Sequence, residues 1–155
     1  MDNVIHWYPG HMAKTRRMIE DNLKLIDVVV EIIDARIPFS GRNKDFDDIL
    51  KNKPRLLVLN KADLADSSAT DEWVSYYAKN GIRVIPISCT TGAGINKVFS
   101  EARRLTQDRI DRDKEKGRTR TLKIMMAGIP NVGKSSLINR LIGKASTKTG
   151  DKAGV

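Results

Sequence analysis

The sequence has little that would serve an extracellular or a membrane protein. Only one of its 155 residues, Cys89, is a cysteine, so the chain cannot form an internal disulfide. No apolar run approaches the roughly 20 residues that span a bilayer. Residues 1–9 also lack the apolar segment of a secretion signal. These absences favour a protein of the reducing cytoplasm and predict no membrane partner.

Aromatic residues make up only 5% of the chain, but hydrophobic residues make up 40% and charged residues 30%, the balance of a folded globular protein. The length suits one domain. The 28 basic residues outnumber the 19 acidic ones and give a net charge of +9. Clustered Lys and Arg displace counterions from phosphates, so one interpretation is a polyanionic partner such as RNA or DNA. The other is a charge that only keeps the protein soluble.

Four apolar runs rich in β-branched residues predict buried strands, at residues 28–33, 56–59, 82–87 and 122–127. The segments between them have helical spacing. We expect helices at residues 11–26, at residues 71–79, and from Ile95 through Leu105 with a polar extension and a linker that Gly117 interrupts. Alternating strands and helices predict a three-layer α/β fold, with a mostly parallel sheet and helices on both faces.

Residues 128–135 match the phosphate-loop pattern G-x-x-x-x-G-K-S, between a predicted strand and a helical pattern. In such a loop, backbone N–H groups and the start of the helix surround a phosphate. Lys134 is expected to contact the β- and γ-phosphates, and Ser135 to ligate Mg²⁺. The expected phosphate-binding residues are Asn131, Val132, Gly133, Lys134, Ser135 and Ser136. The loop alone does not separate GTPases from ATPases or small-molecule kinases.

The tetrapeptide Asn60-Lys61-Ala62-Asp63 follows a predicted strand, where open α/β sheets bind their ligands. An ionised Asp63 can accept hydrogen bonds from both N1–H and the 2-amino group of guanine, a pair of donors that adenine lacks. Lys61 can lie over the base plane, and Asn60 can hold neighbouring loops. The alternative is an Asn-Lys turn in which Asp63 caps a helix.

A third segment, Ser88-Cys89-Thr90, follows the strand predicted at residues 82–87. We expect backbone N–H groups of Ser88 and Cys89 to meet the guanine O6. Cys89 itself is expected to be a small, half-buried residue and not a nucleophile.

The motifs stand in inverted order, because residues 60–63 and 88–90 precede the phosphate loop. This order predicts a circularly permuted P-loop GTPase domain. Two further segments, Trp-Tyr-Pro-Gly-His-Met-Ala-Lys at residues 7–14 and Asp-Ala-Arg-Ile-Pro at residues 34–38, complete the pattern. Together the motifs resemble the ribosome biogenesis GTPase A family, also called YlqF or RbgA, over nearly the whole chain.

The resemblance implies an enzyme that hydrolyses GTP to GDP and phosphate with Mg²⁺, and that acts in assembly of the large ribosomal subunit. It also implies binding to the precursor particle and its ribosomal RNA, with faster hydrolysis in the bound state. We expect a cytoplasmic monomer. The alternative is a basic RNA-binding module that keeps GTP as a structural ligand without turnover, and a third candidate is a P-loop ATPase or kinase.

The resemblance also assigns roles to two further residues. His11 is expected to be catalytic, by orienting the attacking water or accepting its proton, and its alternative role is to cap or pack at a helix start. Asn131 matches the asparagine that holds K⁺ beside the phosphates in potassium-stimulated GTPases, and its alternative role is loop hydrogen bonding.

The domain is expected to occupy residues 1–155 and to stop early. Residues 151–154 spell Asp-x-x-Gly, but no strand precedes them, and they resemble the family's first switch segment instead. We therefore expect the sequence to be truncated before the true Asp-x-x-Gly switch motif and before the family's C-terminal helical domain. Such a fragment should bind nucleotide better than it hydrolyses it.

Overall fold

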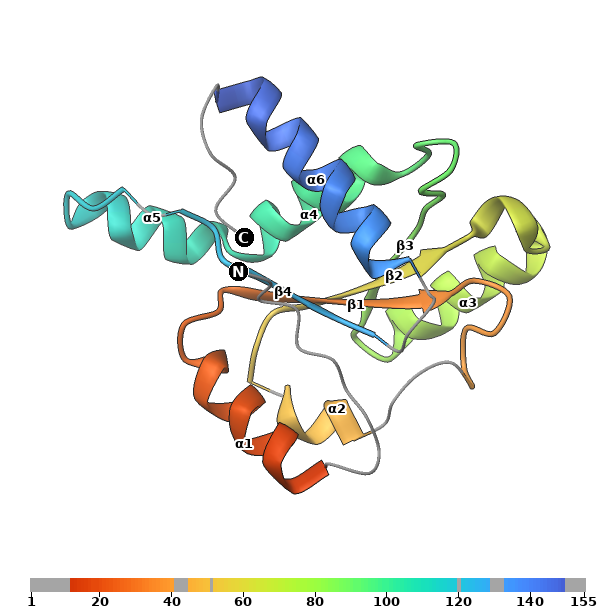
Figure 1. Ribbon diagram of the computed structural model, residues 1–155, viewed down its shortest axis with the longest axis horizontal. Helices are drawn as coiled ribbons and strands as arrows, with labels where there is room; N and C mark the ends of the chain where they lie inside the picture. The colour runs from red at the N-terminus through yellow and green to blue at the C-terminus, as the bar shows by residue number, and fades with distance from the viewer. Residues whose placement is uncertain (1–11, 41–44, 51, 120, 129–132, 150–155) are drawn as a thin grey trace.

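A computed structural model describes residues 12–40, 45–50, 52–119, 121–128 and 133–149 (Figure 1). Its centre is a four-stranded sheet with the strand order β3-β2-β1-β4. All neighbouring strands are parallel, as the sequence pattern predicts. The strands are β1 (Val28–Asp34), β2 (Arg55–Asn60), β3 (Arg83–Pro86) and β4 (Ile124–Ala127).

Helices cover both faces of this sheet, which confirms the three-layer α/β prediction (Figure 1). In the view of Figure 1, α4 and α6 lie above the sheet, and α1 and α2 lie below it. The helices are α1 (Met12–Leu23), α2 (Asp45–Ile49), α3 (Ser67–Lys79), α4 (Ile95–Leu105), α5 (Gln107–Glu115) and α6 (Lys134–Thr149), with a short 3-10 helix η2 (Ala62–Leu64). Within the described ranges, no helix is long and apolar enough to cross a membrane.

The core follows from the alternation of side chains along each strand. One face of the sheet presents Val30, Ile32, Leu56 and Val58, which pack with residues of α4 and α6 such as Val98 and Leu137. The other face packs Val29 against α1 and Leu57 against Tyr77 of α3. Every residue of β1 is buried, because this strand lies between two neighbours and under helices on both faces.

The helix boundaries differ from the predictions where side chains compete for the backbone. The first helix ends at Leu23, three residues before the predicted end. Helix α3 begins earlier than predicted, at Ser67, because the Asp66 side chain accepts a hydrogen bond from the Ala69 N–H at 2.8 Å and caps it. The predicted polar extension is a separate helix, α5. The helix is interrupted at Thr106, whose hydroxyl donates to the carbonyls of Ala102 and Arg103.

Two acidic side chains of the β1 region are buried and paired. The Glu31 carboxylate lies 2.6 Å from Nη2 of Arg55, whose Nη1 lies 2.6 Å from Asp47 of α2. Asp27 accepts from Arg109 of α5 at 3.2 Å and from the backbone N–H of Lys123 at 2.9 Å. These pairs tie α2 and α5 to the sheet.

Candidate nucleotide-binding site

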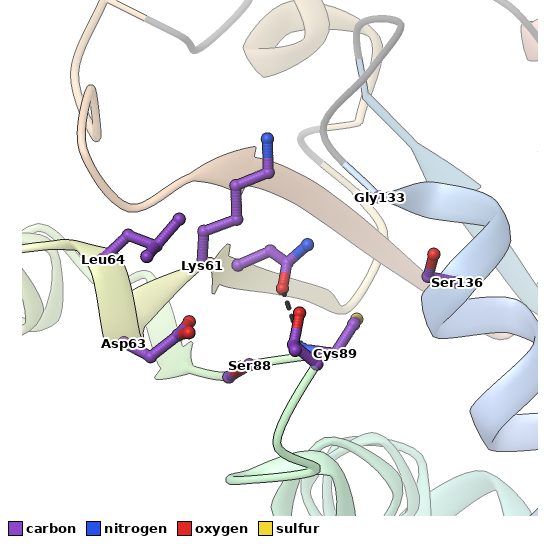
Figure 2. Close-up of a pocket in the computed structure, with 9 residues that line it drawn as sticks. Lys61, Asp63, Leu64, Ser88, Cys89, Gly133 and Ser136 are labelled. Carbon is purple, nitrogen blue, oxygen red and sulfur yellow. Dashed lines mark hydrogen bonds between the residues drawn. The ribbon is translucent and has the colours of Figure 1, made fainter.

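Three motifs that are far apart in the sequence line one pocket at the carboxyl edge of the sheet (Figure 2). Parallel strands bring their carboxyl ends to the same edge, and β2, β3 and β4 each lead into one of the motifs. The pocket has a volume of about 350 Å³, within the usual size of small-molecule sites. Its lining residues are Asn60, Lys61, Asp63, Leu64, Ser88, Cys89, Thr90, Gly133 and Ser136.

Asn60 links the two halves of the pocket. Its side chain is buried, and its Oδ1 accepts a hydrogen bond from the Cys89 N–H at 3.2 Å, the dashed line in Figure 2. On the opposite side, a Cβ added at Gly133 would lie 2.3 Å from Asn60 Nδ2. Gly133 also has a φ of +95°, so both its conformation and its close contact with Asn60 require glycine.

Lys61 and Asp63 occupy the turn between β2 and η2. Lys61 has a φ of 63° and is the one non-glycine residue with positive φ in the described part of the chain. Asp63 is exposed and lines the pocket, and the described residues offer it no hydrogen-bond or ion-pair partner. The alternative in which Asp63 caps a helix is wrong, because Asp66 caps α3 and Asp63 lies inside η2. The Asp63 carboxylate is therefore open to a ligand.

The segment after β3 differs from expectation in how its backbone is used. The Ser88 N–H donates to the Ala93 carbonyl at 3.0 Å, and the Cys89 N–H donates to Asn60. Both N–H groups already have an acceptor, so a guanine O6 would have to share a donor that is already bonded. Cys89 is half-buried, and burial raises the pKa of its thiol, which keeps it protonated and unreactive.

The phosphate side of the pocket lies at the start of α6. Lys134 is the first residue of this helix and is buried, and burial lowers the pKa of its ammonium group. A desolvated cation at a helix N-terminus favours an anion beside it. Ser135 and Ser136 follow on the exposed side of the same turn. The predicted site residues His11, Asn131 and Val132 lie outside the described residues.

Sequence reasoning missed two contacts that support this pocket. Asp34, the last residue of β1, accepts from Arg36 Nε and Nη2 at 3.0 and 2.7 Å and lies 3.6 Å from Lys61 Nζ. The hydrogen bonds from Arg36 lower the pKa of Asp34 to about 2 despite partial burial. Arg140 of α6 donates to the Thr90 carbonyl at 3.1 Å. The signal for the first contact was available, since Asp34 ends its strand as Asn60 ends the next.

A parallel α/β sheet with a phosphate-loop pattern at one strand end and a base-reading motif at another defines a P-loop GTPase fold, here with its motifs in circularly permuted order. The family described as 50S ribosome-binding GTPase matches residues 123–155. The chain is 51% identical over 153 residues to the ribosome biogenesis GTPase A of Bacillus licheniformis, a match that covers 98% of this chain and 54% of the relative.

More distant relatives are similar to the same part of the chain. The chain is 42% identical over 140 residues to mitochondrial ribosome-associated GTPase 1 of Mus musculus, across 90% of this chain and 42% of the relative. The crystal structure of GNP-bound YlqF from T. maritima superposes with a TM-score of 0.61 at 34% identity, over 84% of this chain and 48% of that one. Over nearly its whole length the chain is therefore similar to ribosome biogenesis GTPase A proteins, and it spans about half the length of the curated relatives that it matches.

Proposed function

We propose that residues 1–155 are the circularly permuted GTP-binding domain of a GTPase that acts in assembly of the large ribosomal subunit. One observation carries the proposal: Asn60 contacts both the 88–90 segment and Gly133 of the phosphate loop, so the base-reading and phosphate-binding motifs share one pocket. The names of the relatives, ribosome biogenesis GTPase A and ribosome-associated GTPase, support the biological setting.

Base selection would come from Asp63. Its exposed carboxylate at the pocket wall can accept from the two adjacent donors of guanine, whereas adenine would leave it unpaired. Lys61, which lines the same wall, would lie along the base plane. Ser88 and Cys89 would line the part of the pocket that holds the base.

Phosphate binding would come from the start of α6. Lys134 would meet the β- and γ-phosphates, while Gly133 and Ser136 line the pocket beside it. Mg²⁺ would be held by Ser135 and phosphate oxygens, and it would neutralise charge during transfer to water. Among the described residues, no group of three or more acidic, His or Cys side chains could hold a metal ion.

Other parts of the proposal depend on the family resemblance. Asn131 and Val132 would complete the phosphate loop, Asn131 would also hold K⁺, and His11 would orient the attacking water. The precursor of the large subunit and its ribosomal RNA would be the partners of a cytoplasmic monomer. The net charge of +9 suits such a partner.

The base assignment is tested by Asp63→Asn in the full-length protein. This variant should weaken GTP binding by at least about tenfold, the size of a lost charged hydrogen bond, and should improve binding of xanthosine triphosphate. Asp66→Asn is the matched control, because it changes the same charge three residues away while an asparagine still caps α3. Equal GTP affinity in the Asp63→Asn and control variants would refute the assignment.

The enzymatic part is tested by GTP turnover of the full-length protein with large ribosomal subunits, Mg²⁺ and K⁺. Stimulated hydrolysis that Lys134→Ala abolishes is the expected result. Tight GTP binding without hydrolysis under these conditions would favour a nucleotide-stabilised RNA-binding module instead.

A further inference from the structure

Asp34 is a buried carboxylate beside the pocket that the proposed binding steps do not use. It ends β1 in register with Asn60, the last residue of β2. Its side chain is 10% exposed, and it is not among the residues that line the pocket. Arg36 donates to this carboxylate from its backbone N–H at 2.9 Å, from Nε at 3.0 and 3.3 Å, and from Nη2 at 2.7 Å.

Lys61 connects Asp34 to the pocket. Its Nζ lies 3.6 Å from Asp34 Oδ2, and its side chain lines the pocket. Figure 2 shows this side chain extended away from Asp63, from a backbone in the left-handed region that residues other than glycine seldom adopt. The turn that presents the base-reading motif therefore has both its backbone and its longest side chain held in one arrangement.

The three charges divide the contacts unequally. Arg36 makes the short hydrogen bonds, and these lower the pKa of Asp34 to about 2. Lys61 Nζ lies at ion-pair distance from Asp34, and the attraction between the two charges directs the ammonium group toward the end of β1. Asp34 is thus a fixed negative charge that Lys61 approaches from the pocket side.

We propose that Asp34 is a positioning residue for base recognition: its carboxylate draws the Lys61 ammonium to the end of β1, so that the aliphatic part of Lys61 lies along the wall where the base binds. This inference rests on the proposed function. Arg36 acts one step further out, because it fixes the Asp34 carboxylate in place.

The test is a double-mutant cycle in the full-length protein, with dissociation constants for GTP and GDP. Asp34→Asn should weaken both nucleotides by about threefold to fivefold, the size of one partly exposed ion pair. In a Lys61→Met background the same change should alter affinity by less than about 1.5-fold, because no ammonium group remains to be positioned.

Asp27→Asn is the matched control. Asp27 precedes the other end of β1, is also buried and also pairs with an arginine, Arg109. Its loss should lower the thermal midpoint of unfolding without changing nucleotide affinity. If Asp34→Asn does not fold, Asp34→Glu is measured instead. Because this variant keeps the negative charge that attracts Lys61, it should bind GTP within about twofold of wild type.

The outcomes separate cleanly. An equal loss in the wild-type and Lys61→Met backgrounds would mean that Asp34 acts through general structure, and a loss for GTP but not GDP would place its effect at the γ-phosphate. An Asp34→Glu protein that binds as weakly as Lys61→Met would also overturn the inference. Absence of guanine-nucleotide binding in the wild-type protein would overturn the proposed function itself.

Discussion

Replacing Gly133 by alanine tests the central claim that one close contact joins the two halves of the pocket. The added Cβ would lie 2.3 Å from Asn60 Nδ2 and 3.5 Å from Asn60 Cγ. Because Asn60 is buried and its amide is bonded to the Cys89 N–H, the amide cannot move aside without breaking that bond. The variant should therefore separate the phosphate loop from the base-reading loops.

The expected loss of binding free energy in Gly133→Ala has two contributions. A left-handed backbone costs a residue with a Cβ about 1–2 kcal/mol. Leaving the Cys89 N–H without its acceptor costs about 1–3 kcal/mol more. The free protein can relieve both costs by moving Gly133 away from Asn60. A bound nucleotide contacts both loops and requires them to stay close together, so the cost reduces the binding affinity. Their sum of about 2–5 kcal/mol corresponds to a loss of at least about 30-fold in GTP affinity.

The assay is titration of a fluorescent GTP analogue, with thermal unfolding of the same samples. Gly143→Ala is the control, because this glycine lies in the same helix and an added Cβ would meet nothing within 4 Å. The control should bind normally and gain about 0.5–1 kcal/mol of stability from its helical alanine. A Gly133→Ala protein that binds GTP within about threefold of wild type would refute the reasoning.

Three further predictions concern stability measured by urea unfolding. Because the pKa of Asp34 falls from 3.8 to about 2 on folding, its ionised form stabilises the protein above about pH 4. The stability difference between wild type and Asp34→Asn should accordingly shrink as pH falls toward 2, and a constant difference would contradict this. Asp66→Ala should cost about 1 kcal/mol through the lost cap of α3, whereas Asp66→Asn should cost only a few tenths. Arg55→Met should cost about 3–5 kcal/mol because it removes the arginine paired with the buried Glu31 carboxylate, and Glu31→Met in the same chain should recover much of that loss.

The sheet and the position of the pocket were predictable from the sequence. Long β-branched runs are buried on both faces of a parallel sheet, so they identify strands reliably, and the carboxyl ends of such strands meet at one edge. The motifs at Asn60, Ser88 and Gly133 each follow a strand, so the sequence pattern places them at the same edge of the sheet.

Other features depend on information that local patterns do not contain. Helix α2 has five residues and η2 three, too short for a helical repeat to be read. The contact between Asp34 and Lys61 depends on the register of β1 against β2. The hydrogen bond from the Cys89 N–H to Asn60 depends on the rotamer of the Asn60 side chain. The sequence pattern carries no information on that rotamer, so this bond was not predicted.

The strand order bears on how the chain folds while it is being synthesised. β1, β2 and β3 are neighbours in space and all precede β4, which pairs with β1 at the outside of the described sheet. Three strands with their helices can thus assemble as they emerge, and the strand that leads into the phosphate loop joins last without separating any pair. In such an order the phosphate loop reaches the pocket only after all four described strands are in place, so nucleotide binding would report that this part of the sheet has formed.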